Sequence, residues 1–241
     1  MIEQRLSQER GLGDHGWLHS RHTFSFGGYW DPKQTGFSDL LVINDDRVVA
    51  SRGFGAHPHS NMEIISYVLE GELAHKDSMG TGSAIIPGDV QLMSAGSGVT
   101  HSEFNNSTTE GVHFLQIWIV PSEKGTPPGY QQVSVPDDEK RGQFRLIVSP
   151  QGENNALSVR QDVRIYAGLF DGEEQQTFTL DEDRYAYIHV ARGEVTVNGL
   201  AFKAGDGARV RHERELSFTA GKEAEVLLFD LRPVEVNRSI R

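Results

Sequence analysis

The chain has 241 residues, which is enough for two domains of about 100 to 120 residues each. Its 37% hydrophobic and 24% charged residues are typical of a globular protein and exclude a largely disordered chain. The net charge of −11 disfavours direct nucleic-acid binding, and the absence of cysteine excludes disulfides and thiolate metal sites, so any metal must be held by nitrogen and oxygen.

The N-terminus carries no targeting signal that we can identify. Residues 1–13 are charged and lack an apolar segment, and the longest apolar run, at 112–120, is interrupted by His113 and Gln116. We therefore expect a cytoplasmic protein without a membrane segment, acting as a monomer.

Short apolar segments rich in Val, Ile, Phe and Tyr recur along the whole chain, bounded by Gly, Asp, Asn or Pro. Their lengths and spacing predict the strands of an all-β protein, and no segment has helical periodicity over three turns. Asn198-Gly199 predicts a type I′ hairpin, because both residues must adopt positive φ. The segments lie at 40–43, 63–69, 90–93, 112–120, 163–170, 186–190, 194–197 and 226–231.

The stretch 121–142 is the least periodic part of the chain and contains Pro-Pro-Gly at 127–129. We interpret residues 133–142 as a linker between an N-terminal domain at 1–132 and a C-terminal domain at 143–241. Gly-Glu and Gly-Asp turns recur in the same order in both halves, which favours two related domains.

Two histidines two residues apart, His57 and His59, begin the most informative pattern of the chain. Alternate side chains of a strand point to one face, so one strand can supply both imidazoles. A glycine turn at 96–98 precedes a second segment in which His101 and Glu103 alternate in the same way. Together they predict a divalent-metal site with positions open for water, oxygen or substrate.

The carboxylate of this site has two candidates. Glu63 lies four residues after His59 and shares its parity if the strand is unbroken, so parity alone leaves Glu63 and Glu103 as alternatives. An isolated His is more often a structural residue than a ligand. Packing explains the cluster less well than a metal does, because a buried carboxylate among imidazoles would lack a compensating cation.

These residues also carry a family resemblance. Residues 57–71 resemble the first cupin motif and 88–105 the second, although Ser51 stands where the pattern has Gly. The fuller pattern resembles the pirin family and, within it, the bacterial branch. Its motifs are His15-Gly16-Trp17, His22-Thr23-Phe24-Ser25-Phe26, Gly53-Phe54-Gly55, His57-Pro58-His59, Met93-Ser94-Ala95-Gly96 and His101-Ser102-Glu103.

The resemblance implies a bicupin, with two β-barrel, jelly-roll-like domains packed together and a degenerate, metal-free C-terminal domain. It implies His57, His59, His101 and Glu103 as the metal ligands, with Glu63 in a supporting role. The expected cofactor is one divalent ion per chain, Fe²⁺, with nickel, copper, manganese and zinc as alternatives.

The implied activity is that of a metal-dependent dioxygenase that opens a flavonol such as quercetin with dioxygen and releases carbon monoxide. Glu103 or Glu63 would be the catalytic base that takes the substrate proton. The resemblance equally implies an alternative, a metal- or redox-dependent regulatory protein that binds a transcription factor or a metabolic enzyme. The sequence does not separate these two functions.

Other histidines have simpler interpretations. His15, His19 and His22 lie among aromatic residues, and we expect them to pack at a seam rather than to line the site. His75 and Asp77 could form a pair that supports the metal ligands or belong to a turn, and we expect the turn.

Overall fold

The computed structural model describes residues 1–235, and strands make up most of their regular structure. Within this part of the chain the one α-helix, α1 (Asp137–Lys140), has four residues, and 3-10 turns lie at Ser7–Glu9 and Glu153–Asn155. The all-β prediction is confirmed. None of the helices described is long and apolar enough to cross a membrane.

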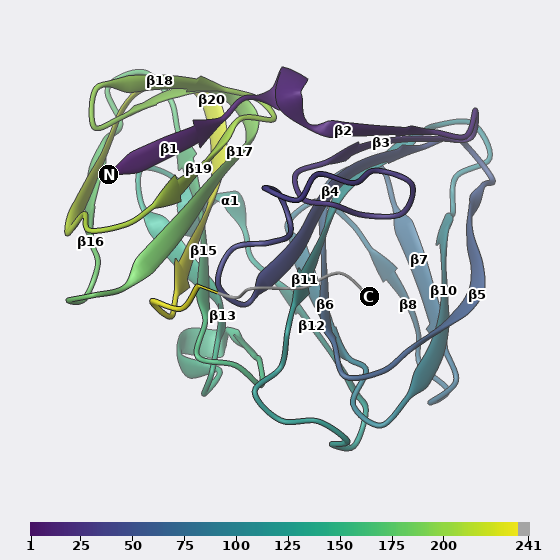
Figure 1. The fold of residues 1–241 in the computed structure, drawn as a ribbon. Coiled ribbons are helices and arrows are strands. Elements are labelled where there is room, and N and C mark those ends of the chain that lie inside the picture. The colour runs from purple at the N-terminus through teal and green to yellow at the C-terminus, as the bar shows by residue number, and fades with distance from the viewer. Residues whose placement is uncertain (236–241) are drawn as a thin grey trace.

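The first half of the chain forms two facing antiparallel sheets, on the right of Figure 1. Their orders are β12-β9-β6-β11-β4-β3-β2 and β5-β10-β7-β8. The sheets form an open, jelly-roll-like sandwich rather than a closed barrel. The strands are β2 (Gly11–Asp14), β3 (Leu18–His22), β4 (Leu40–Val48), β5 (Gly53–His59), β6 (Glu63–Glu70), β7 (Leu73–Asp77), β8 (Gly82–Ile85), β9 (Asp89–Ser94), β10 (Val99–Asn105), β11 (Val112–Ile119) and β12 (Gly129–Ser134).

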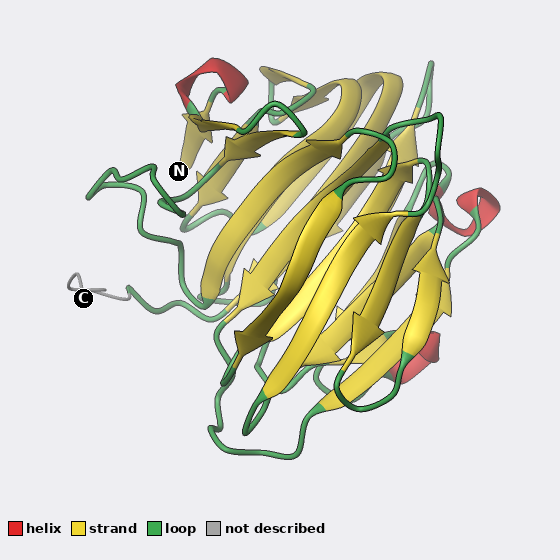
Figure 2. Cartoon of the chain, turned by 90° about the vertical axis from the view of Figure 1, so that its right-hand side faces the viewer, coloured by secondary structure: helices red, strands yellow, loops and turns green. Residues whose placement is uncertain are grey.

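The second half forms one nine-stranded sheet that folds over on itself on the left of Figure 1, and in the turned view of Figure 2 it lies behind the first half. Its two longest strands, β17 and β20, pair through three register shifts, and such bulges bend a strand. The strands are β13 (Phe144–Ser149), β14 (Leu157–Ser158), β15 (Arg164–Phe170), β16 (Gln176–Thr179), β17 (Tyr185–Val197), β18 (Leu200–Lys203), β19 (Gly207–Val210) and β20 (Glu215–Leu231), joined by β1 (Ile2–Arg5).

The N-terminal strand β1 belongs to the sheet of the second half. It pairs antiparallel with β19, with Ile2 opposite Val210, and lies on the left of Figure 1 beside that strand. The segment predicted as N-terminal domain, 1–132, thus contributes its first strand to the other half. The predicted linker, 133–142, begins at the end of β12 and contains α1. The exact domain boundaries stay predictions.

The predicted hairpin at Asn198-Gly199 is confirmed. Val197 pairs with Leu200, and the two turn residues have φ of 46° and 81°. Both values lie in the left-handed region that a type I′ turn requires, which Asn and Gly adopt more readily than other residues.

The central strands β6, β9 and β11 of the seven-stranded sheet are buried on both faces, so their side chains pack into two separate compartments. On β6, Ile64 packs with Met93 inside the first half, whereas Ile65 and Tyr67 belong to a core shared with the second half. Alternate side chains of a strand point to opposite faces, which separates these two sets. The shared core holds the halves together through residues such as Leu227.

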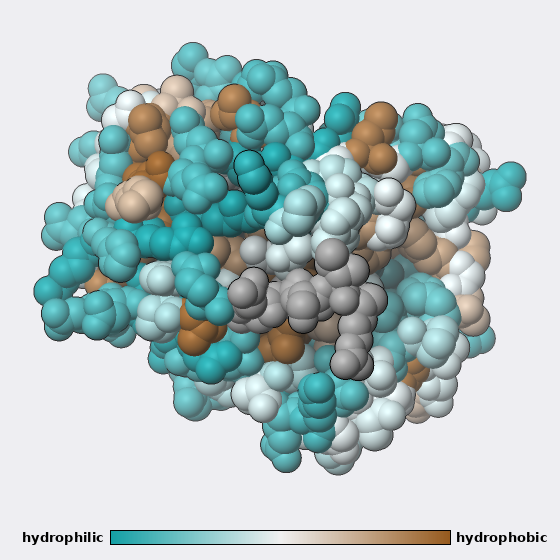
Figure 3. Space-filling model, viewed as in Figure 1, coloured by the Kyte–Doolittle hydropathy of each residue, from teal (hydrophilic) through white to brown (hydrophobic). Residues whose placement is uncertain are grey.

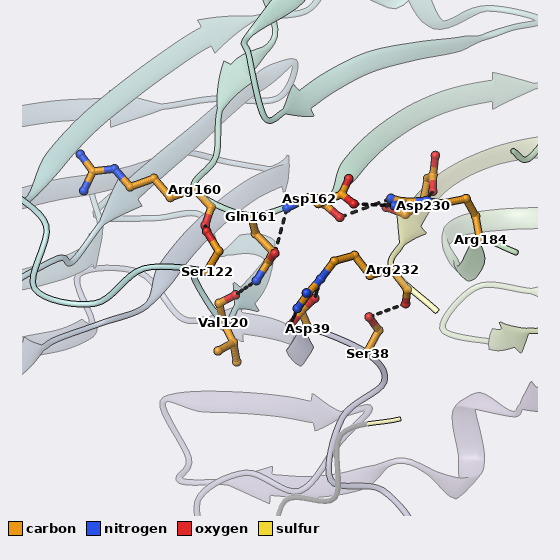
Figure 4. Close-up of polar contacts among 10 residues, drawn as sticks. All are labelled: Ser38, Asp39, Val120, Ser122, Arg160, Gln161, Asp162, Arg184, Asp230 and Arg232. Carbon is orange, nitrogen blue, oxygen red and sulfur yellow. Dashed lines mark hydrogen bonds and ion pairs between the residues drawn. The ribbon is translucent and has the colours of Figure 1, made fainter. Parts of the chain in front are cut away.

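Polar contacts complete this interface near its edge (Figure 4). Arg232 donates two hydrogen bonds of 2.8 Å to the Asp39 carboxylate, one from Nε to Oδ2 and one from Nη2 to Oδ1. The Gln161 side chain donates a hydrogen bond of 2.8 Å to the carbonyl of Val120. The planar two-point pairing of Arg232 with Asp39 fixes the orientation of the two side chains as well as their distance.

The surface shown in Figure 3 is mostly hydrophilic, and its apolar residues are dispersed among polar ones. Single exposed apolar side chains are normal on folded proteins.

Candidate metal centre and substrate cavity

Strands β5 and β10 carry the predicted histidines side by side. They pair antiparallel with His101 opposite His57, and the register shifts between His101 and Glu103. On β5, Pro58 is exposed while His57 and His59 are half-buried, and on β10 both His101 and Glu103 are buried. The alternation predicted for both segments is confirmed, and the pairing brings the two segments together.

The three imidazoles form a compact cluster. Ring centroids lie 4.8 Å apart for His57 and His59, 4.5 Å for His57 and His101, and 4.9 Å for His59 and His101. One nitrogen from each residue lies within 4.8 Å of the corresponding nitrogens of the other two. This spacing allows three nitrogens to converge on one ion.

The cluster favours neutral imidazoles. Burial lowers the pKa of His101 to about 3, and repulsion from His57 and His59 acts in the same direction. Burial and the neighbouring His57 lower the pKa of His59 to about 4. Because only a neutral imidazole has a free lone pair for a metal, the environment prepares both residues as ligands near pH 7.

Hydrogen bonding shows which atoms are free. His57 Nδ1 lies 2.7 Å from the carbonyl oxygen of Gly55, so Nδ1–H donates and Nε2 keeps its lone pair. His101 is 2% exposed, yet neither of its ring nitrogens has a hydrogen-bond partner. An unpartnered buried imidazole is costly, and a divalent cation would satisfy it. The donor set therefore fits a metal ion.

Glu103 is buried beside His101, and its carboxylate is held by two side chains from the opposite sheet. Ser66 donates to Oε1 at 3.1 Å, and Gln116 donates to Oε2 at 2.7 Å. Burial raises its pKa, against the effect of these hydrogen bonds and of His75. The Glu103 carboxylate lies close to a ring nitrogen of His75 and of His101. These three residues form a second group that could hold a metal ion, and it shares His101 with the three-histidine cluster.

Glu63 lies elsewhere, and the assumption of an unbroken strand from His59 to Glu63 is wrong. β5 ends at His59, Asn61 turns the chain with φ of 52°, and β6 begins at Glu63 in the other sheet. Glu63 then shares its face with Ile65, toward the second half, and accepts a 2.7 Å hydrogen bond from Ser94. The structure does not bring Glu63 to the histidine cluster.

His75 and Asp77 do more than form a turn. His75 Nε2 lies 2.9 Å from Asp77 Oδ2, and both side chains are fully buried. The other Asp77 oxygen accepts the backbone N–H groups of Met79 and Thr81, which is the predicted turn. This carboxylate orients the imidazole, so that the unpartnered His75 Nδ1 remains free on the side of the second group.

A cavity of about 540 Å³ adjoins the cluster. Its lining combines aromatic rings with polar side chains, and this combination is typical of a site that binds a flat molecule with a few polar groups. Its aromatic lining includes Phe26, Tyr29, Phe54 and Trp118, and its polar lining includes Ser20, His22, Asn44, Asp46, Glu103 and Gln116, beside His57 and His59.

The N-terminal histidines are placed differently from our expectation. His15 and His22 line the cavity instead of only packing at a seam, and His19 is exposed beside Asp14. His22 is buried and held by Asn44 at 2.8 Å, next to Phe26 at a ring distance of 5.4 Å. Part of the expected aromatic packing therefore exists, but it forms a wall of the cavity.

A row of polar residues across the seven-stranded sheet was missed from the sequence. His22, Asn44, Gln116 and Ser66 are successive cross-strand partners on β3, β4, β11 and β6. Ser66 and Gln116 stand in mostly apolar strands, whereas His22 and Asn44 stand among other polar residues, so no single strand gives a distinct signal. Only the register places them in line beneath Glu103.

Comparisons with known proteins agree with this architecture. The family model described as Pirin matches residues 4–119, and one described as Quercetinase C-terminal cupin domain matches residues 146–231. A protein named quercetin 2,3-dioxygenase from Escherichia coli (strain K12) is 46% identical over 97% of this chain and 100% of its own. A pirin-like protein from Caulobacter vibrioides is 38% identical over 95% of this chain and 99% of its own.

A solved structure extends the likeness to the fold. The bacterial pirin YhhW from Escherichia coli, in complex with nickel(II), superposes with a TM-score of 0.92 at 44% identity, covering 97% of this chain and 100% of that one. Two jelly-roll-like units packed through a shared core define this protein as a bicupin. With relatives of this identity along nearly its whole length, the chain belongs to the pirin family.

Proposed function

We propose that this protein is a metal-dependent dioxygenase that cleaves a flavonol such as quercetin with release of carbon monoxide. The observation that carries the proposal is the three-histidine cluster at the wall of a cavity lined by aromatic rings. The name of the 46% identical relative supports the same activity, and the nickel in the 44% identical structure supports a divalent metal.

In this proposal His57, His59, His101 and Glu103 hold one divalent ion, for which Fe²⁺ is our first choice. The convergence of the imidazoles and the unpartnered nitrogens of His101 support the three nitrogen ligands. Glu103 is supported as the fourth ligand by its position next to His101, with which it forms the second group together with His75. When bound, the ion supplies Lewis acidity and a template for the flavonol and dioxygen.

The side chains around the ion would do the remaining work. Glu103 would accept the proton of the flavonol hydroxyl at a carboxylate oxygen, a role that its raised pKa and its position on the cavity wall support. Ser66 and Gln116 would keep the carboxylate in place during this transfer. Phe26 and Trp118, whose rings meet edge to face at 5.3 Å, would exclude water around the substrate.

The test is turnover of quercetin by protein loaded separately with Fe²⁺, Ni²⁺, Cu²⁺, Mn²⁺ or Zn²⁺. We expect loss of flavonol absorption together with carbon monoxide for at least one metal, and neither for the metal-free protein. If none of the five metals gives loss of flavonol absorption or carbon monoxide, the proposal is refuted. The experiment also ranks the metals, because ligand type alone does not choose among them.

The regulatory alternative stays a prediction, to be tested by comparing the partners captured with the ferrous and the ferric protein. Cytoplasmic location and a monomeric state likewise stay predictions. Size-exclusion chromatography with light scattering tests the latter, and a mass of twice 26.8 kDa would contradict it.

A further inference from the structure

Strand β4 carries two adjacent acidic residues with opposite surroundings. Asp45 faces the second half, where Arg10 lies 3.1 Å and His113 lies 2.7 Å from its oxygens. Asp46 faces the interior of the first half and lines the cavity. It is 3% exposed, and its Oδ1 has no hydrogen-bond partner. Both oxygens of Asp45 therefore have partners, whereas one oxygen of Asp46 has none.

A buried carboxyl oxygen without a hydrogen-bond partner, such as Asp46 Oδ1, is unfavourable for the free protein. Burial, with smaller contributions from Asp45 and Glu103, raises the pKa of Asp46 to about 7. Ser20, its cross-strand neighbour on β3, is the side chain that hydrogen-bonds it. Among the described residues none donates a hydrogen bond to Oδ1, so a ligand in the cavity that Asp46 lines can supply the missing partner.

The rest of the cavity indicates the chemistry of that partner. Phe26 and Trp118 line it with an edge-to-face pair, and Trp118 in turn lies 5.1 Å from the ring of His59. A flat aromatic ligand suits such walls. Among the polar side chains of the lining, Asp46 is the carboxyl with an unpartnered oxygen, so it can accept a hydrogen bond from the polar edge of that ligand, and a phenolic O–H is a donor of the required kind.

We propose that Asp46, supported by Ser20, is a specificity-determining residue that binds a phenolic hydroxyl of the substrate. This hydroxyl lies on an outer ring, remote from the hydroxyl and ketone directed at His57, His59 and His101. The inference rests on the proposed function and narrows its substrate class to flavonols with a free hydroxyl on an outer ring. A site built to pair a hydroxyl discriminates strongly against the analogue without it, because its polar group is then left unpaired.

The test compares quercetin, which has hydroxyls on both outer rings, with 3-hydroxyflavone, which has none. Affinities are measured by calorimetry for the wild type, Asp46→Ala and Asp46→Asn, with and without metal. Asp46→Ala is expected to weaken quercetin binding about 10- to 100-fold and to change 3-hydroxyflavone binding less than about twofold. Asp46→Asn keeps one acceptor oxygen and is expected to lose less. Turnover should show a higher KM with kcat nearly unchanged.

Asp45→Asn is the matched control, because it removes a carboxylate from the same strand on the opposite face. It is expected to leave the ratio of the two affinities as in the wild type. Melting temperatures of all variants verify folding. If Asp46→Ala is too unstable to measure, the affinity comparison is made with Asp46→Asn.

Equal losses for both ligands would overturn the inference, because Asp46 would then only shape the cavity. Unchanged affinities would overturn it as well. Either result, with the wild type still binding and cleaving quercetin, leaves the proposed function intact. A wild type that binds neither flavonol refutes the proposed function and the inference together.

Discussion

The two halves of this protein share a jelly-roll-like architecture but fill its interior in opposite ways. In the first half, β5 and β10 direct three imidazoles toward one point beside a cavity of about 540 Å³. In the second half the interior is packed with aromatic rings, with Phe144 and Phe218 4.7 Å apart and Phe170 and Phe218 5.9 Å apart. Two domains of similar fold can thus differ in function, because the side chains that face the interior decide where chemistry can occur.

One histidine from each half makes this comparison concrete. His101 and His189 are both buried, neither has a hydrogen-bond partner on either ring nitrogen, and burial lowers the pKa of each to about 3. His101 faces two other imidazoles, whereas His189 faces the interface beside Arg10, Asp45 and His113. A single unpartnered imidazole is not a metal site. Convergence of several is what distinguishes the first half.

Replacing these two histidines gives the largest expected effect. His101→Ala removes the proposed ligand that belongs to both candidate groups, and we expect metal affinity to fall by at least about 1,000-fold. His189→Leu is the matched control and should keep the wild-type affinity. Metal content after dialysis and calorimetric titration with Ni²⁺ measure both. Equal metal loss in the two variants would contradict the distinction between the halves.

The filled interior of the second half should matter for stability and not for metal. Phe218→Ala opens a cavity among Phe144, Phe170 and Leu228 and is expected to reduce the free energy of unfolding by about 3–5 kcal/mol. Urea denaturation of the metal-free protein measures this loss, and metal titration of the folded variant should match the wild type. A weakened metal site in the folded variant would show that the halves are coupled.

The two carboxylates give a sharper comparison within the first half. Glu103→Gln is expected to reduce metal affinity or kcat by about 10- to 100-fold, because it removes the charge next to His101. Glu63→Gln changes a carboxyl that faces the second half and bonds Ser94, so both quantities should stay within about twofold. A larger effect from Glu63→Gln than from Glu103→Gln would reverse the assignment.

The smallest expected effect concerns the pH dependence of stability. The folded-state pKa of His189 is about 3, below its ordinary value of 6.5. Between pH 7 and 5 the unfolded chain therefore binds a proton at this residue and the folded chain does not, so the wild type loses stability as pH falls. His189→Leu should reduce this loss by about 1–2 kcal/mol. Parallel pH profiles from chemical denaturation would show that His189 does not contribute.

Much of the site was predictable because its signals are local. His57 and His59, and likewise His101 and Glu103, alternate within single strands, so their shared faces follow from the period of two. The all-β fold and the hairpin at Asn198-Gly199 followed from equally local patterns. The resemblance to the pirin family drew on the same motifs.

Other parts could not be predicted in this way. Parity placed Glu63 with the histidines only while the strand was assumed to continue, and one turn at Asn61 moved it to another sheet. The cavity lining by His15 and His22, and the pairing of β1 with β19, depend on segments distant in sequence. Nothing within those segments specifies their partners.

Local sequence patterns were therefore sufficient to predict the all-β fold class, the shared faces of His57 and His59 and of His101 and Glu103, and the resemblance to the family. Which of these faces meet follows from the packing of distant segments. So does the unpartnered oxygen of Asp46 in the cavity, the pairing of Asp45 with Arg10, and the position of Glu63 outside the histidine cluster. The physical reason is that side-chain direction is set residue by residue along a strand. Convergence is instead set by sheet register and by the packing of two sheets, which many distant residues determine together.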